Sequence, residues 1–154
     1  MAERYSIPAD FARLASKGGR LEKVGLHESV RQHILLMLIS RWGSLRVDPQ
    51  FGCAFWEYDF ESSAQLESKR HFLESSITEM IASREPRLDP VKLKVSFKVY
   101  NSPLPSVRGR RMLSLKKRIE MKVEGRLLET NKAFKPAPFQ LYFSPVAIEH
   151  KASR

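Results

Sequence analysis

The sequence predicts an α+β domain with two helices packed on one face of a small antiparallel sheet. Apolar residues recur at helical spacing in two stretches between residues 26 and 85, whereas from residue 91 they alternate with polar residues. Strands that are polar on one face need a cover on the other face, and helices that precede them in the chain can supply it. This layered arrangement is therefore the expected architecture.

The length and composition are typical of one folded domain. A chain of 154 residues can bury a hydrophobic core, and 42% of these residues are hydrophobic. We predict a mobile or partner-ordered arm at residues 1–25, one α+β domain at 26–148 and a short tail at 149–154. The sequence shows neither an apolar run that could span a bilayer nor a signal-like N-terminus, which predicts a cytoplasmic protein without a membrane partner.

Two helices are predicted before the strands. The first begins at Leu26, and its apolar stripe widens until little of its second half is polar. Gly43 is expected to end it, because glycine adopts the left-handed conformation of a helix cap without a Cβ penalty. Ser62 and Gln65 form a capping box at the start of the second helix. That helix should end at Glu85, because a proline follows.

The segment between the helices, residues 44–60, has the composition of an extended loop or short hairpin that aromatic side chains hold in place. Its turn-forming residues, together with the glycine before it, are predicted to have a structural role. These residues are Gly43, Asp48, Pro49, Phe51 and Gly52.

Three strands are predicted after the helices. The first, residues 91–99, alternates apolar and polar residues without interruption. A basic loop at 100–111 separates it from the second strand, residues 113–127, in which Gly125 is a candidate bulge. A third and shorter strand is expected near residues 139–143.

The positive charge of the chain is concentrated on these strands. The net charge is +10, and residues 91–135 contain 13 basic and 3 acidic residues. Such asymmetry predicts a face for an acidic partner, a class that includes proteins, nucleic acids and lipid headgroups. The residues of this predicted basic surface are Lys92, Lys94, Lys98, Arg108, Arg110, Arg111, Arg118 and Lys122.

Nucleic-acid binding is the alternative function that this surface raises. Proteins that bind single strands combine positive charge with exposed aromatic residues. Phe97, however, has the core-facing parity of its strand, so the lysine-bearing face is predicted to lack an aromatic platform. A solvated face, or a docking face for an acidic protein, is therefore favoured over nucleic acid.

No pattern in the sequence predicts an active site. The four histidines have no metal-ligand spacing, and the sequence contains neither a phosphate-binding loop nor a nucleophile elbow. Glu79 or Glu85 with Asp89 would be the candidate carboxylate pair of a glycosidase, but these acids are expected on the solvated side or end of a helix. We predict no catalytic residue, no metal, no cofactor and no small-molecule substrate.

Four residues at the end of the second helix form a motif with two interpretations. An arginine can bind a partner's carboxylate through two parallel hydrogen bonds, and a glutamate can bind a basic group. The alternative is a helix stop with two solvated charges, and the residues alone leave both interpretations open. The four residues are Glu85, Pro86, Arg87 and Leu88.

The order of these motifs resembles a known family. Residues 28–34 lead into an apolar helix, 41–44 close it, the Asp-Pro-Gln-Phe-Gly motif at 48–52 follows, and 85–88 end a long helix before an alternating strand. This order is similar to that of the GPW-type baseplate-wedge proteins of tailed phages and of TssE, the baseplate subunit of type VI secretion systems. Trp42 and the basic loop depart from the family pattern.

The resemblance implies a structural, non-enzymatic protein with a fold like that of the contractile-sheath subunit. It implies that residues 85–88 bind baseplate wedge proteins, and that the sheet edge accepts a strand from a sheath subunit and so initiates sheath assembly. The chain would then belong to a larger hetero-oligomeric assembly, a membrane-docked baseplate in the bacterial cytoplasm. Some members of the family are named as lysozymes. The sequence of this chain lacks a convincing pair of catalytic carboxylates, which argues against that activity.

Overall fold

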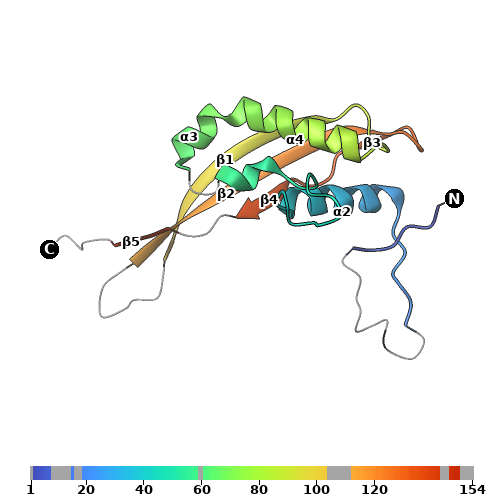
Figure 1. Cartoon of the computed structure of the whole chain (residues 1–154), viewed down its shortest axis with the longest axis horizontal. Coiled ribbons are helices and arrows are strands. Elements are labelled where there is room, and N and C mark those ends of the chain that lie inside the picture. Colours follow the sequence, from blue (N-terminus) through green and yellow to red (C-terminus); the bar gives the residue numbers. More distant parts are fainter. Residues whose placement is uncertain are drawn as a thin grey trace.

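The computed structural model describes residues 2–7, 15, 19–58, 61–103, 112–142 and 146–149. In these residues helices precede an antiparallel sheet, which confirms the predicted α+β fold, and no helix among them is long and apolar enough to cross a bilayer. The elements are α2 (Leu26–Ile39), the 3-10 helix η1 (Ala54–Tyr58), α3 (Ser63–Ser68), α4 (Arg70–Arg84), β1 (Lys92–Pro103), β2 (Met112–Leu127), β3 (Lys132–Phe134), β4 (Phe139–Tyr142) and β5 (Val146–Glu149) (Figure 1).

Strand β2 is the centre of the sheet. β1 pairs with it antiparallel along one side, from Lys92 opposite Glu124 to Pro103 opposite Leu113. On the other side β3, β4 and β5 pair with successive parts of β2, like pieces of one interrupted strand. The sequence predicts β1, β2 and β4 but not β3 or β5, two short strands that form by pairing with β2.

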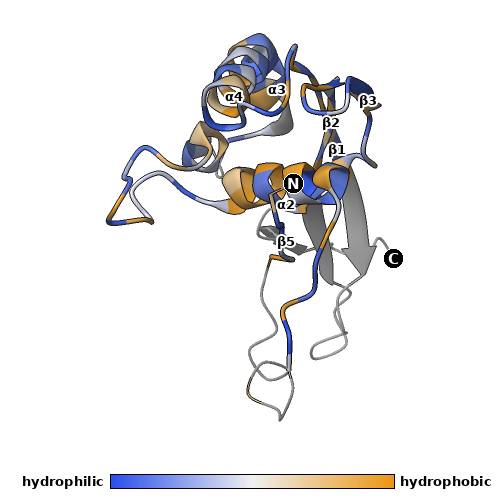
Figure 2. Cartoon of the chain, turned by 90° about the vertical axis from the view of Figure 1, so that its right-hand side faces the viewer, coloured by the Kyte–Doolittle hydropathy of each residue, from blue (hydrophilic) through white to orange (hydrophobic). Residues whose placement is uncertain are grey.

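The sheet has one covered face and one open face. Residues at alternate positions of the β1–β2 pair, such as Val95, Met121 and Val123, are buried. Figures 1 and 2 together show α2, α3 and α4 on the same side of the strands. The residues between the buried ones point to the open side, which confirms the alternation predicted for these strands.

The core lies between the covered face and the helices. Burial of apolar surface, at about 25 cal/mol per Å², is its main stabilising contribution. Cys53 is buried in it, and burial raises the pKa of its thiol to about 11, so the thiol stays protonated at neutral pH. Other core residues are Val30, Ile34, Met37 and Leu38 from α2, Leu73, Ile77 and Ile81 from α4, and Val95, Ile119, Met121, Val123 and Phe134 from the sheet.

Helix α2 ends at Ile39, before the end predicted at Gly43, so that prediction is wrong. Ser40 has an extended backbone (φ −82°, ψ 140°), and its hydroxyl donates to the Leu36 carbonyl oxygen at 2.7 Å. The Ser40 carbonyl oxygen then accepts the N–H of Cys53 at 2.9 Å, which ties the returning loop to the end of the helix. Gly43, with φ +74°, belongs to the turn beyond the helix.

The second predicted helix is interrupted. Its capping box is present, because the Gln65 N–H donates to Ser62 Oγ at 3.3 Å and the Ser62 N–H donates to Gln65 Oε1 at 2.8 Å. Lys69, with φ −95° and ψ 2°, lies between α3 and α4 and breaks the helix into two. α4 then runs to Arg84, next to the predicted end at Glu85.

The candidate bulge at Gly125 lies where β2 changes its pairing partners. Glu124 pairs with Lys92 of β1, Gly125 pairs with Phe134 of β3 on the other side of β2, and the bridge from Leu127 to Leu88 is offset by one residue from the β1 register. A Cβ at this glycine would lie 2.6 Å from the Pro90 carbonyl oxygen and 2.8 Å from Leu88 Cδ1. The glycine therefore allows the segment after α4 to pass close to β2.

The described parts of the N-terminal arm are attached to the domain. Tyr5 forms an antiparallel bridge with Lys23, and a backbone N–H of the arm donates to the Gln32 side chain of α2 at 2.9 Å. Arg4 forms an ion pair with Glu129, in the turn after β2, at 2.5 Å. A mobile or partner-ordered arm stays a prediction, since much of the arm lies outside the described residues.

Candidate binding surface at the Glu85 turn

Residues 85–88, which we call the Glu85 turn, lie in the connection from α4 to β1. Pro86 cannot continue the helix, because it lacks a backbone N–H and its ring clashes with the preceding turn. The Leu128 N–H, just beyond β2, donates to the Arg87 carbonyl oxygen at 2.9 Å. The turn is thus fixed between the helix layer and the end of the central strand.

The side chains of the Glu85 turn divide into two buried and two accessible ones. Glu85 is 0% exposed, and Leu88 lies in the core. Pro86 is exposed, and the Arg87 side chain is 28% exposed. The part of the turn that a partner can reach therefore consists of Pro86 and one side of Arg87.

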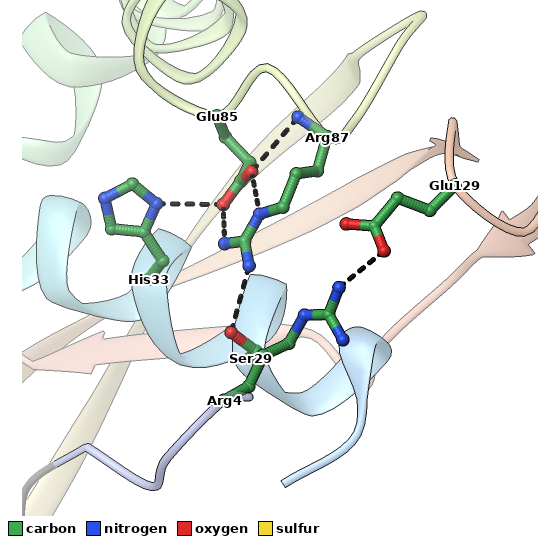
Figure 3. Close-up of polar contacts among 6 residues, drawn as sticks. All are labelled: Arg4, Ser29, His33, Glu85, Arg87 and Glu129. Atoms are coloured by element: carbon green, nitrogen blue, oxygen red, sulfur yellow. Dashed lines mark hydrogen bonds and ion pairs between the residues drawn. The ribbon is translucent and has the colours of Figure 1, made fainter. Parts of the chain in front are cut away.

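The Glu85 carboxylate is held by Arg87 of the same turn and by His33 of α2 (Figure 3). Arg87 donates from Nε to Oε1 at 2.7 Å and from Nη2 to Oε2 at 2.5 Å, and its backbone N–H reaches Oε1 at 3.2 Å. Nδ1 of His33, on α2, lies 2.8 Å from Oε2. Arg87 Nη1 also donates to Ser29 Oγ, one helical turn before His33, at 3.0 Å. This network joins α2 to the end of α4.

These contacts keep Glu85 ionised. Burial alone would raise its pKa, but the hydrogen bonds from Arg87 and His33 outweigh burial and lower the pKa to about 2. The hydrogen bonds to Glu85 in turn raise the pKa of Arg87. An ionised carboxylate only accepts hydrogen bonds, so Nδ1 of His33 carries the hydrogen in its contact with Glu85.

The free energy of unfolding is expected to fall as the pH is lowered through the acid range. The folded-state pKa of Glu85, about 2, lies below the ordinary value of 4.5, so the unfolded chain binds the proton first. The contribution of Glu85 is therefore complete above its unfolded pKa and is lost as the pH falls toward its folded pKa. Urea unfolding at a series of pH values should show a shallower dependence for Glu85→Gln than for wild type. Parallel profiles would contradict this expectation.

Two residues of this network, Ser29 and His33, have no role in the sequence-based prediction. The available signal is their spacing of four on α2, which puts both side chains on one helix face. Polar side chains beside the buried stripe of a helix indicate an internal hydrogen-bond partner. The sequence does not identify that partner as Glu85, because the contact depends on how α2 lies against the end of α4.

The predicted turn residues of the loop lie beside this network. Arg84, the last residue of α4, forms an ion pair with Asp48, and its Cζ lies 5.7 Å from the ring centroid of Phe51. His33 stacks with Phe51 at a centroid distance of 6.4 Å. The hydrogen bond from Arg84 holds the pKa of Asp48 below its usual value. The structure thus brings the loop motif and the Glu85 turn together.

The glycines of the loop allow close backbone contacts. Gly52 has φ +120°, and a Cβ there would lie 2.6 Å from the Ser40 carbonyl oxygen. Trp42 Nε1 donates to the Gly52 carbonyl oxygen at 2.9 Å, and the Gly43 N–H donates to the Pro49 carbonyl oxygen at 2.8 Å. These contacts close the loop against the end of α2.

A groove of about 560 Å³ separates this loop from α4. Trp42 and Gln50 line it on the loop side, and Met80 and Arg84 line it on the helix side. Arg84, which lines this groove, directly precedes Glu85 in the chain.

The structure brings part of the predicted basic surface together. The register of β1 and β2 puts five of its residues on the open face of the sheet, namely Lys92, Lys94, Lys98, Arg118 and Lys122. The other three, Arg108, Arg110 and Arg111, lie outside the described residues. Tyr142, which pairs opposite Arg118, adds one exposed aromatic residue to this face, a placement that only the register reveals.

The acids considered as a catalytic pair lie in different surroundings. Glu85 is buried in its ion pair, Asp89 is exposed, and Glu79 lines the groove. Within the described part of the chain, no group of three or more His, Cys, Asp or Glu side chains is placed to hold a metal ion. The chemistry that the Glu85 turn itself offers is hydrogen bonding through a positioned guanidinium.

Comparison with known proteins identifies the family. The family model of baseplate wedge protein gp25 matches residues 24–132, well over half of the chain. The chain belongs to the gp25 baseplate wedge family. This match confirms the resemblance that the order of the motifs indicates. Membership of the family supports a structural role for the chain in a baseplate of the phage-tail type. None of the curated proteins matches its sequence.

Solved structures that are similar to this gp25-family chain include the following one. It is that of a Geobacter sulfurreducens protein whose name describes it provisionally as a tail lysozyme. The sequence identity is 22%, the match covers 85% of this chain and 96% of that chain, and the TM-score is 0.44. A likeness of this degree carries no argument about activity.

Proposed function

We propose that this gp25-family chain is a structural subunit of a contractile injection machine, either a type VI secretion system or a phage-tail-like particle. It docks on other wedge proteins through the Glu85 turn and initiates sheath assembly. It acts by binding, in the bacterial cytoplasm, as part of a baseplate that docks at the membrane. The family membership and the geometry of the Glu85 turn support this proposal.

The observation that carries the proposal is the internal pairing of Glu85. Its carboxylate fixes the Arg87 guanidinium on a turn that Pro86 keeps out of the helix. The bonds to Glu85 and Ser29 use one hydrogen on each guanidinium nitrogen, which leaves a second hydrogen on each Nη for an oxygen atom of a partner. A side chain that is already fixed loses little conformational entropy on binding.

The same geometry argues against a lysozyme-like role for Glu85. The general acid of a glycosidase must be protonated near neutral pH, and it therefore needs a raised pKa. The pKa of Glu85 is lowered to about 2, and its carboxylate is enclosed by Arg87 and His33. At neutral pH Glu85 has no proton to donate to a sugar. These facts favour a binding role for the turn.

Strand addition by a sheath subunit is expected at the edge formed by β3, β4 and β5. The other edge, β1, is partly occupied, because the Val95 N–H donates to Glu74 Oε1 of α4 at 2.8 Å. A strand adding to β1 would have to displace this contact, whereas among the described strands β3, β4 and β5 each pair with β2 alone, which leaves their outer edge for an added strand.

Replacing Pro86 by tryptophan is expected to abolish co-purification of wedge and sheath proteins with the tagged chain. Pro86 is exposed, so a bulky side chain there blocks docking and leaves the core intact. Glu67→Trp is the matched control, because Glu67 is 52% exposed on α3. Each variant replaces the native protein in its own cells, and mass spectrometry identifies the proteins that co-purify.

Circular dichroism and thermal unfolding establish that both variants are folded. If folded Pro86→Trp recovers the same partners as wild type, the Glu85 turn is not the docking surface. If Glu67→Trp also loses these partners, the loss is not specific to the Glu85 turn, and the proposal for the turn fails as well.

A further inference from the structure

The open face of the sheet carries an unbalanced positive charge. Along β1 and β2 this face consists of the even-numbered residues, which pair with one another across the two strands. No described helix lies on this side of the sheet (Figure 2). Between positions 92 and 98 of β1 and 118 and 126 of β2, its basic residues are Lys92, Lys94, Lys98, Arg118, Lys122 and Arg126, and its acidic residues are Glu120 and Glu124.

The register places like charges directly opposite each other on this face. Lys94 pairs with Lys122. Lys98 pairs with Arg118. Such pairs destabilise a sheet, and Glu120 relieves them only in part, at 3.4 Å from Lys98 and 4.0 Å from Lys122. A surface that keeps this repulsion is stabilised when an anionic partner binds to it.

We infer that this open face binds an acidic segment of a partner protein. A phosphate backbone is negative along its whole length, so Glu120 and Glu124 would repel it. A polypeptide can place carboxylates beside the lysines and other groups beside the two glutamates. Among positions 92–98, 118–126 and 139–142 of this face, Tyr142 is the exposed aromatic residue, whereas single-strand binding uses several stacked aromatics.

The spacing of the lysines suits an extended segment. Residues two apart on one strand are about 6.6 Å apart, so Lys94 and Lys98, which are four residues apart and lie opposite basic residues, match acidic residues four positions apart in an extended peptide. Lys122 lies across the strand from Lys94 and adds a second positive charge at the same level. This face and the Glu85 turn do not overlap, so its binding does not depend on docking through the turn.

The test measures binding of two fluorescent probes to the full chain at about physiological salt. One probe is a peptide of alternating glutamate and serine, and the other is a single-stranded oligothymidine with the same number of negative charges. The peptide is expected to bind more tightly than the oligonucleotide. Lys94→Glu is expected to weaken peptide binding about tenfold, because it replaces an attraction by a repulsion.

The same variant gives an independent check on folding. Glu at position 94 would lie opposite Lys122, so an attractive pair replaces a repulsive one. Lys94→Glu is therefore expected to melt at the wild-type temperature or slightly above it while it binds the peptide more weakly. A loss of binding cannot then be attributed to a loss of fold.

Arg70→Glu is the matched control. It makes the same change in net charge on α4, where the Arg70 side chain is 42% exposed, and it should change peptide binding by less than about twofold. Equal weakening by both variants would overturn the inference, since only net charge would then be recognised. Tighter binding of the oligonucleotide would assign the face to nucleic acid instead. Unchanged peptide affinity in Lys94→Glu would exclude the face altogether.

Discussion

Replacing Arg87 by alanine is expected to lower the free energy of unfolding by roughly 3–5 kcal/mol. The substitution removes both side-chain hydrogen bonds from Arg87 to the Glu85 carboxylate, which is 0% exposed in the folded chain, and leaves His33 as its remaining side-chain partner. A buried charge that loses its counter-ion keeps its desolvation cost without the compensating interaction. Urea unfolding at neutral pH measures the loss directly.

A double-mutant cycle shows whether this loss comes from the pair. The combined variant Glu85→Gln and Arg87→Ala is expected to lose less stability than the sum of the single variants, because no unpaired charge remains. Arg84→Ala is the matched control, since its partner Asp48 lies near the surface and that ion pair should contribute far less. Should Arg87→Ala cost no more than Arg84→Ala, the buried pair stabilises the fold no more than the pair near the surface does.

The buried pair also decides which variants can test docking. Alanine at Glu85 or Arg87 changes folding and binding together, so a loss of assembly in such a variant has two causes. Pro86 carries no part of the internal network and is exposed. A substitution at Pro86 therefore separates docking from stability.

Replacing Gly52 by alanine is expected to cost roughly 2–4 kcal/mol of stability. The backbone of Gly52 has φ +120°, where side chains are strained, and the new Cβ would lie 2.6 Å from the Ser40 carbonyl oxygen. That oxygen is held by the Cys53 N–H at 2.9 Å, so it cannot move away without breaking the contact that closes the loop. Thermal and urea unfolding measure the loss.

Gly43→Ala separates the two causes of this effect. Gly43 also has a positive φ, +74°, but a Cβ there would meet nothing within 4 Å. It should cost only the left-handed backbone strain, about 1–2 kcal/mol. If Gly52→Ala and Gly43→Ala have the same free energy of unfolding, the close contact between the new Cβ and the Ser40 carbonyl oxygen costs no stability.

The periodicities of the sequence predict the layers correctly because they report burial directly. Alternation places Val95 and Val123 toward the helices and Lys94 and Lys122 away from them, and the structure agrees. The capping box at Ser62 is also local, since both of its hydrogen bonds join residues three apart. Such features need no knowledge of the rest of the fold.

Predictions that depend on distant neighbours fail or stay open. α2 ends at Ile39 because the loop returns to pair with Ser40, and Gly125 is required because Pro90 passes close to β2. Neither partner can be identified from local sequence. The inward direction of Glu85 is of the same kind, because it depends on His33 and Arg87 closing around it.

By itself, the sequence determined the α+β class, the faces of the first two strands, the basic character of the open face and the motifs that mark the family. Tertiary structure alone decided that Glu85 is an internal counter-ion, that Pro86 and Arg87 form the accessible part of the turn, and that like charges meet across β1 and β2. The physical reason is the distance along the chain between the residues that interact. Patterning reflects burial along one element, whereas ion pairs, close backbone contacts and strand register depend on segments that meet only when the chain folds.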